Sequence, residues 1–254
     1  MAGSQLYRET EYDDGGDYDL RNPWSADDDF FLALAKRVGG PVLDLGCGTG
    51  RLARGLSGLG LEVTALDAAP AMLARARALD PAGTIRYLDG DVRRLRLDRR
   101  YRLALMTAHG FQHLLTAADQ TAALERIAAH LMPDGCFAFD LRNLAAQDFT
   151  QPGLFRHSSR FVDGEGCHVA IEVAPHWDAI TGIATYFLRR RAGAGGVIGR
   201  SRARLRYSEP AALDRLLAAA GFVVAERYGD WPDAPFEATS PEIITISRLA
   251  GSSP

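Results

Sequence analysis

The sequence predicts an α/β fold, in which a doubly wound sheet is interrupted by an inserted antiparallel β-meander. Short apolar runs alternate with segments of helical spacing between residues 27 and 141, and this alternation resumes after residue 208. Between those two blocks, apolar and polar residues alternate in successive segments separated by turn residues, which is typical of β-hairpins. At 254 residues, the chain is long enough for a domain with a substantial insertion.

The composition is that of a soluble globular protein, with 47% hydrophobic and 24% charged residues. The formal net charge of -3 argues against a nucleic-acid binder that neutralises phosphates. Three widely spaced cysteines indicate reduced thiols rather than a disulfide framework or a zinc cluster. No stretch has the pattern of an export signal or the length of a membrane span, so we expect a cytoplasmic protein with no membrane partner.

A strand-to-helix junction near the N-terminus is the strongest functional signal. Residues 27–38 predict a helix, which a Gly-Gly-Pro stretch ends, and the apolar run Val42–Leu45 predicts the first strand. The strand gives way to Gly46 and Gly48 before helical spacing begins at Arg51. Glycine permits positive φ and a close backbone approach, and the free N–H groups of the next helix favour a negative group. We therefore expect this junction to bind a nucleotide.

The second predicted strand spans residues 62–66 and ends in Asp67. An acid about 20 residues beyond such glycines is placed to accept hydrogen bonds from both hydroxyls of a ribose. A helix is predicted at residues 68–79, and a third strand at residues 84–87 is followed by an Asp-Gly-Asp-Val stretch at residues 89–92.

Two histidines lie in the loop at the end of the fourth predicted strand, which spans residues 102–107. His109 and His113 fall in the segment 108–114, and ligands of doubly wound sheets bind outside the carboxyl ends of the strands. The remaining elements of the main fold are helices at 122–131 and 209–217 and strands at 136–141, 222–228 and 242–247.

The segment from 151 to 207 departs from the helix–strand alternation. Val169, Ile171 and Val173 alternate with polar or small residues, a second alternating segment follows, and residues 197–207 return after another turn. Arginines at 202, 204 and 206 share one face of the last segment, and a solvated face is favoured there over an anion site.

The glycine motif itself, Asp44-x-Gly46-x-Gly48-x-Gly50 after a strand, differs from the Gly-x-Gly-x-x-Gly of nicotinamide and flavin folds. It resembles the first motif of the class I S-adenosylmethionine-dependent methyltransferases. The stretch Gln112-His113-Leu114 is similar to a His-Leu pair in sugar N-methyltransferases of that superfamily, and the Asn/Asp-Pro-Pro-Tyr/Phe stretch of base amino-methyltransferases is absent from the sequence.

The resemblance implies a Rossmann-like seven-stranded sheet whose last strand is antiparallel, and S-adenosyl-L-methionine as the cofactor. It implies three parts: residues 1–26 as an arm over the cofactor, residues 27–150 and 208–254 as the cofactor-binding α/β domain, and residues 151–207 as an inserted lid that contacts the substrate. Adenine would lie beside Met72, for which core packing is an equal alternative, and would meet Asp91 and Val92, although Asp91 is also a typical turn residue. The cofactor-binding residues expected on this basis are Tyr18, Asp44, Gly46, Cys47, Gly48, Asp67, Ala68, Met72, Asp91, Val92 and Thr107.

The predicted reaction needs few catalytic residues, because the cofactor supplies an activated methyl group. His113 is the candidate proton acceptor, with His109 and Tyr12 behind it, and a role for His113 in the pocket wall is the alternative. We expect no metal, because the loop around the histidines lacks carboxylates.

The expected acceptor is an amine or hydroxyl of a small molecule, such as a natural product or amino sugar. Two alternatives stay open: the same fold carrying out cofactor-dependent chemistry without methyl transfer, as in a cyclase, and methylation of a peptide. The meander could also pair with its copy, which would give a homodimer.

Overall fold

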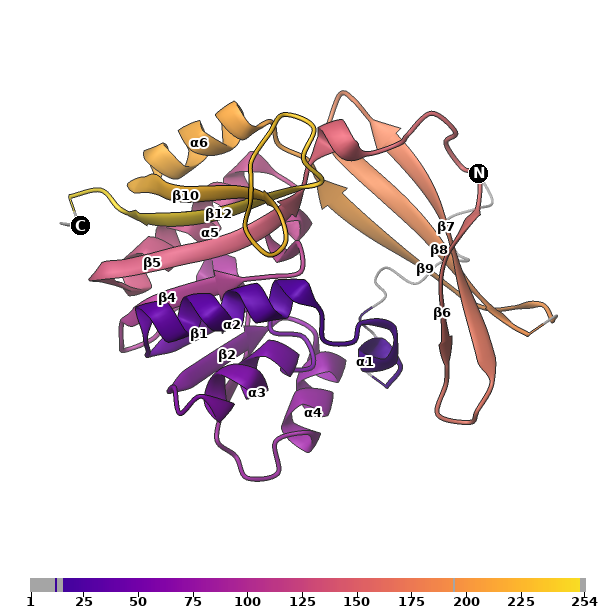
Figure 1. The fold of residues 1–254 in the computed structure, drawn as a ribbon, viewed down its shortest axis with the longest axis horizontal. Coiled ribbons are helices and arrows are strands. Elements are labelled where there is room, and N and C mark those ends of the chain that lie inside the picture. The colour runs from indigo at the N-terminus through magenta and orange to yellow at the C-terminus, as the bar shows by residue number, and fades with distance from the viewer. Residues whose placement is uncertain (1–11, 13–15, 194, 252–254) are drawn as a thin grey trace.

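The computed structural model describes residue 12 and residues 16–193 and 195–251 (Figure 1). Asp13, which the sequence pattern places in the N-terminal arm, lies outside the described residues, as do residues 1–11. Within the described residues, no helix is both long and apolar enough to cross a membrane.

The main sheet confirms the predicted α/β fold. Its strand order is β11-β10-β12-β5-β4-β1-β2-β3, in which β12 runs antiparallel between β5 and β10. A two-residue strand, β11 (Ala234–Pro235), adds an edge strand to the seven that were expected. The seven are β1 (Val42–Leu45), β2 (Val63–Asp67), β3 (Arg86–Asp89), β4 (Tyr101–Met106), β5 (Leu131–Arg142), β10 (Phe222–Asp230) and β12 (Glu242–Leu249).

Helices cover both faces of this sheet, so it is doubly wound (Figure 1). Apolar residues of α2 (Ala26–Val38) and α3 (Arg51–Gly58) pack in one core cluster, and those of α5 (Ala117–His130) and α6 (Pro210–Ala219) pack in the other. Three further helical segments are α4 (Pro70–Ala78), the single-turn α1 (Tyr18–Arg21) and η4 (Leu144–Ala146). Short 3₁₀ turns, η2 (Val92–Arg94) and η3 (Gly110–His113), follow strands β3 and β4.

Two predicted boundaries are wrong by five residues. Helix α5 begins at Ala117, five residues earlier than expected, because the Thr116 side chain caps it by accepting from the Asp119 N–H at 3.0 Å. Strand β5 begins at Leu131 rather than Cys136, because the chain pairs with β4 on both sides of an irregularity in the register.

The insertion forms a separate antiparallel sheet with the order β6-β7-β8-β9, which lies beyond α1 from the main sheet (Figure 1). Strands β7 (His168–Asp178), β8 (Ile183–Ala192) and β9 (Val197–Arg206) match the three predicted segments. The fourth strand, β6 (Arg156–Val162), was not predicted, because it is a largely exposed edge strand whose sequence does not alternate clearly. The expectation of a meander is confirmed and extended by one strand.

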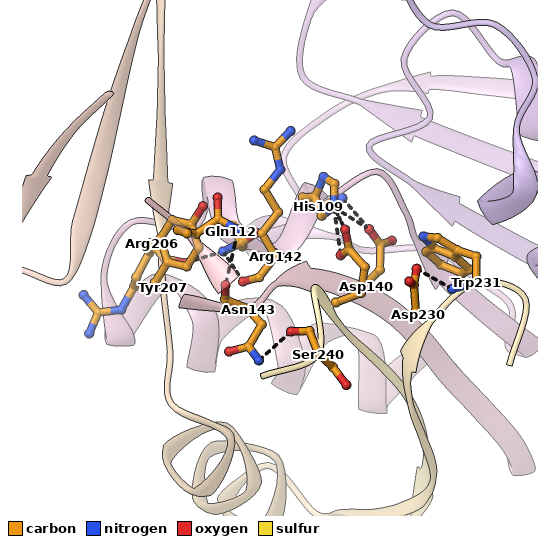
Figure 2. Close-up of polar contacts among 12 residues, drawn as sticks. His109, Gln112, Asp140, Arg142, Asn143, Arg206, Tyr207, Asp230, Trp231 and Ser240 are labelled. Atoms are coloured by element: carbon orange, nitrogen blue, oxygen red, sulfur yellow. Dashed lines mark hydrogen bonds and ion pairs between the residues drawn. The ribbon is translucent and has the colours of Figure 1, made fainter. Parts of the chain in front are cut away.

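Gln112 fastens the inserted sheet to the main sheet (Figure 2). Its side chain is fully buried, accepts from the Arg142 N–H at 2.9 Å at the end of β5, and donates to the Arg206 carbonyl at 3.2 Å at the end of β9. One amide therefore satisfies backbone groups of both sheets.

We expect Gln112→Leu to lower the free energy of unfolding by about 1–3 kcal/mol for each backbone group left buried without a partner. Urea unfolding monitored by circular dichroism measures this. The matched change Gln151→Leu, at an exposed position, should alter stability by less than about 0.5 kcal/mol. Equal effects of the two substitutions would contradict the fastening role of Gln112.

Candidate active site

The glycine loop between β1 and α3 is held by backbone hydrogen bonds and by Asp67. Gly46 and Gly48 have φ values of 71° and 56°, in the left-handed region that favours glycine. The Asp67 carboxylate accepts from the Gly48 N–H at 2.7 Å and from the Ala69 N–H at 2.8 Å. Burial raises the pKa of Asp67, while these backbone hydrogen bonds lower it. The loop and the end of β2 are thus joined through one carboxylate.

The space above this loop fits a ligand with a hydrogen-bond donor. A Cβ built on Gly46 would meet nothing within 4 Å, and one built on Gly48 would meet only the Tyr18 ring, at 4.0 Å. Asp44 is 1% exposed, and its Oδ2 has no hydrogen-bond partner among the described residues. Burial, together with the charges of Asp67 and Asp28, raises the pKa of Asp44 to about 7. A buried acceptor without a donor beside an open cradle is the arrangement expected of a cofactor site.

The other expected cofactor residues are spread along the same sheet edge, but not all present a free polar group. Asp91 caps η2, and its carboxylate accepts from the Arg93 guanidinium at 2.9 Å, which lowers the pKa of Asp91. Met72 is 1% exposed and packs within the core. The remaining residues differ in exposure: Val92 is buried, Cys47 and Thr107 are half-buried, and Ala68 is exposed.

Tyr12 and His113, the two expected catalytic residues, lie together. The Tyr12 hydroxyl is 3.0 Å from His113 Nε2, and the two rings meet edge to face at 5.4 Å. Burial, together with the nearby His109 and Arg142, lowers the pKa of His113 to about 4. His113 is therefore neutral at pH 7.

A second cluster, formed by His109, Asp140 and Glu242, was not predicted as a unit (Figure 2). His109 Nε2 lies 3.1 Å from a Glu242 carboxylate oxygen and 3.4 Å from Asp140 Oδ2. Asp140 is 1% exposed, and burial raises its pKa to about 6, with His109 opposing the rise and Glu242 adding to it. An acid in the apolar run of β5 was the one available signal in the sequence. Glu242 comes near only through the register of β12 on β5, in which Ile244 pairs with Asp140.

A cavity of about 380 Å³ lies between the two histidines and the inserted sheet. Tyr12, which precedes the main domain, lines its wall, and the main domain contributes His109, His113 and Arg142 to the same wall. The inserted sheet contributes apolar residues such as Ile171, Leu188 and Leu205, together with Tyr186. The Arg142 guanidinium lies over the Tyr186 ring, at 5.8 Å from its centroid. The cavity has the volume of a small-molecule site with a few polar groups in an apolar wall.

Comparison with known proteins places this fold and site in a family. Residues 42–135 match the model of a methyltransferase domain. A glycine/sarcosine N-methyltransferase of Parasynechococcus marenigrum is 31% identical over 215 residues, which cover 81% of this chain and 71% of that protein. The chain belongs to the class I S-adenosylmethionine-dependent methyltransferases, and its cofactor is S-adenosylmethionine.

Two further relatives extend the comparison. A dTDP-3-amino-3,6-dideoxy-alpha-D-glucopyranose N,N-dimethyltransferase of Streptomyces fradiae is 38% identical over 94 residues, which cover 37% of this chain and only 36% of that protein. The CcbJ methyltransferase from Streptomyces caelestis has a TM-score of 0.82 at 26% identity, and the similarity covers 96% of this chain and 100% of that one. The likeness to the structure therefore includes the inserted sheet.

The lowered pKa of His113 has a consequence for stability. Between its folded pKa of about 4 and its ordinary value of 6.5, the folded chain binds fewer protons at this site than the unfolded chain. Stability is therefore lost as the pH falls through this window. From pH 7 to pH 5, we expect the wild-type protein to lose about 2 kcal/mol relative to a His113→Gln variant.

Urea unfolding of both proteins at pH 5, 6 and 7 tests this difference. The raised pKa values of Asp44 and Asp140 act in the opposite direction, but they are present in both proteins and cancel in the comparison. A difference that is constant across the three pH values would show that His113 is not desolvated.

Proposed function

We propose that this methyltransferase transfers the methyl group of S-adenosylmethionine to an amine or hydroxyl of a small molecule, such as a natural product or amino sugar, in the cytoplasm. The observation that carries the proposal is the cavity of about 380 Å³ between the carboxyl edge of the main sheet and the inserted sheet. Two relatives named as N-methyltransferases of an amino sugar and of glycine or sarcosine favour an amine.

On this proposal, the cofactor lies over the glycine loop. Gly46, Cys47 and Gly48 let the backbone approach it, Asp67 accepts from the ribose hydroxyls, and the partnerless oxygen of Asp44 accepts from its amino group directly or through water. Tyr18 covers the loop from the N-terminal side. The adenine end is assigned to Ala68, Met72, Asp91 and Val92, and Thr107 closes the site at the end of β4.

The cofactor supplies an activated methyl group when bound, so the protein needs mainly to align the acceptor and exclude water. Tyr12 and His113 are proposed to orient the acceptor from the main-domain side of the cavity. His113 stays neutral at pH 7 and can accept a hydrogen bond there.

The three parts of the chain then have separate tasks. Residues 27–150 and 208–254 bind the cofactor, the arm up to residue 26 closes over it, and the inserted segment 151–207 forms the far wall of the acceptor cavity. A contact between the arm and the insertion supports this division, since Arg190 of β8 pairs with Asp17 at 3.5 Å.

We expect Asp67→Ala to weaken binding of S-adenosylhomocysteine, because two ribose hydroxyls lose a charged acceptor. At about 1.5–3 kcal/mol for each hydrogen bond to a charged group, the loss is roughly 10- to 150-fold per bond. Isothermal titration calorimetry measures the affinity.

Asp89→Ala is the matched control, since Asp89 pairs with Asp67 in the register of β2 and β3 but is exposed. It should bind S-adenosylhomocysteine like the wild type. Unchanged affinity in Asp67→Ala would remove this residue from the site.

The acceptor cavity is tested by Ala203→Trp, which fills it from the inner face of β9. We expect wild-type affinity for S-adenosylhomocysteine and loss of methyl transfer to the acceptor. Release of S-adenosylhomocysteine is followed first with the wild type across amino sugars, amino acids, other small amines and alcohols, and then with the variant on the best acceptor.

The control is Arg204→Trp, one residue along β9 on the opposite face. It should retain turnover. If Ala203→Trp were as active as the wild type, the acceptor would not bind in this cavity, and release of S-adenosylhomocysteine with peptides but with no small molecule would overturn the proposed substrate class.

A further inference from the structure

His109 occupies an unusual backbone position at the wall of the acceptor cavity. Ala108 and His109 have φ values of 53° and 61°, so two consecutive residues other than glycine adopt the left-handed conformation. The His109 N–H donates to Asp140 Oδ2 at 2.9 Å, which fixes the turn at the end of β4. Such a conformation persists where the surroundings enforce it, and it is concentrated at functional sites.

The imidazole of His109 is held in one tautomer by its neighbours. Its Nε2 lies 3.1 and 3.3 Å from the two carboxylate oxygens of Glu242, and 3.4 Å from Asp140 Oδ2. Ionised carboxylates only accept hydrogen bonds, so Nε2 must carry the proton. In the neutral ring, Nδ1 then has the free lone pair.

Nδ1 is open to the cavity. The His109 side chain is 21% exposed and lines the cavity. Its Nδ1 atom is accessible to solvent. Within the described residues, the hydrogen bonds of this ring all run through Nε2. A basic nitrogen is therefore presented to the acceptor, while the opposite nitrogen is backed by two carboxylates.

His113 is less suited to accept a proton. Its Nε2 is engaged by the Tyr12 hydroxyl, and burial holds its pKa near 4, with no carboxylate bonded to it among the described residues. The positively charged Arg142 also opposes its protonation. A protonated His109, in contrast, would face the carboxylates of Glu242 and Asp140.

We propose that His109 Nδ1 accepts the proton that the acceptor loses, and that Glu242 and Asp140 are positioning residues for this ring. The proposal rests on the proposed function. An N–H bond of the acceptor's ammonium form, or the O–H bond of its hydroxyl, breaks, its proton forms a bond to Nδ1, and the electron pair stays on the acceptor atom. That pair forms the new bond to the methyl carbon, while the pair of the old carbon–sulfur bond stays on sulfur. The imidazolium, paired with Glu242, then returns its proton to water.

The tautomer can be measured without knowing the acceptor. Protein labelled with [¹⁵N]histidine and bound to S-adenosylhomocysteine is studied by long-range ¹H–¹⁵N NMR at pH 8, and His109 is assigned from a His109→Asn variant. Asparagine is chosen because it tolerates the left-handed conformation. We expect Nε2 to be protonated and Nδ1 to be unprotonated. The reverse tautomer would overturn the proposal.

Two variants test the positioning role. Glu242→Leu should shift His109 toward a mixture of tautomers, whereas Glu237→Leu, at an exposed position in the preceding loop, should leave it unchanged. An unchanged tautomer in Glu242→Leu would show that Glu242 does not position the ring.

Catalysis is tested with the best acceptor from the substrate panel. Loss of the proton acceptor should lower kcat of His109→Asn roughly 100- to 10,000-fold, with the KM for S-adenosylmethionine unchanged. A His113→Gln variant should keep more of its kcat than His109→Asn, and the opposite ranking would return the role to His113. Calorimetry with S-adenosylhomocysteine on the same samples shows whether the cofactor site is intact. Wild-type affinity is expected in both variants, so a fall in kcat can be assigned to the acceptor side of the site.

The three side chains could instead hold a cation, since their ligand atoms lie within 4.8 Å of one another. Protein stripped with EDTA is therefore titrated with Mn²⁺ and Mg²⁺. Selective broadening of the His109 resonances by Mn²⁺, with recovery of kcat on adding either ion, would replace the proton-acceptor role with a metal site.

Discussion

Buried and half-buried carboxylates at one edge of the main sheet are the constraint on which the rest of the structure depends. Parallel strands bring Asp44, Asp67 and Asp140 to that edge from β1, β2 and β5. Desolvation raises the pKa of each, so each must find donors or remain costly to ionise. Asp67 accepts from backbone N–H groups and fixes the glycine loop, and Asp140 accepts from the His109 backbone. Asp44 has one oxygen without a partner among the described residues. The same electrostatic requirement therefore shapes the loop after β1 and the turn after β4.

The inserted sheet adds an apolar wall opposite this charged edge. Its inner face presents Ile171, Leu188 and Leu205, while the buried Gln112 ties the end of β9 to the end of β5. A cavity bounded by two histidines and Arg142 on one side and by aliphatic groups on the other suits a ligand that is itself amphiphilic. The two sheets thus act together, although each has its own hydrophobic core.

Local patterns made most of the fold predictable. The apolar run at β1, the glycines after it and Asp67 are adjacent in sequence to the structures they specify, and β7 to β9 alternate clearly. Strand β6 was not predicted, because an edge strand with few buried residues shows little alternation of apolar and polar residues. Tyr12 and His113 were both expected to be catalytic residues, but the hydrogen bond between them was not predicted. The approach of Glu242 to His109 was not, because it depends on the antiparallel register of β12 across 133 residues of chain.

The extent of the matched methyltransferase domain has an evolutionary consequence. The region shared with the methyltransferase domain model ends at residue 135, before Asp140, Arg142 and the entire inserted sheet. Of the groups that line the cavity, the two histidines fall inside that region, whereas the apolar wall falls outside it, as does Glu242, which contacts His109. Sequence changes in the C-terminal half can therefore alter the cavity wall while residues 42–135 stay recognisable. Similarity confined to residues 42–135 indicates a common methyl donor. It does not indicate which molecule receives the methyl group.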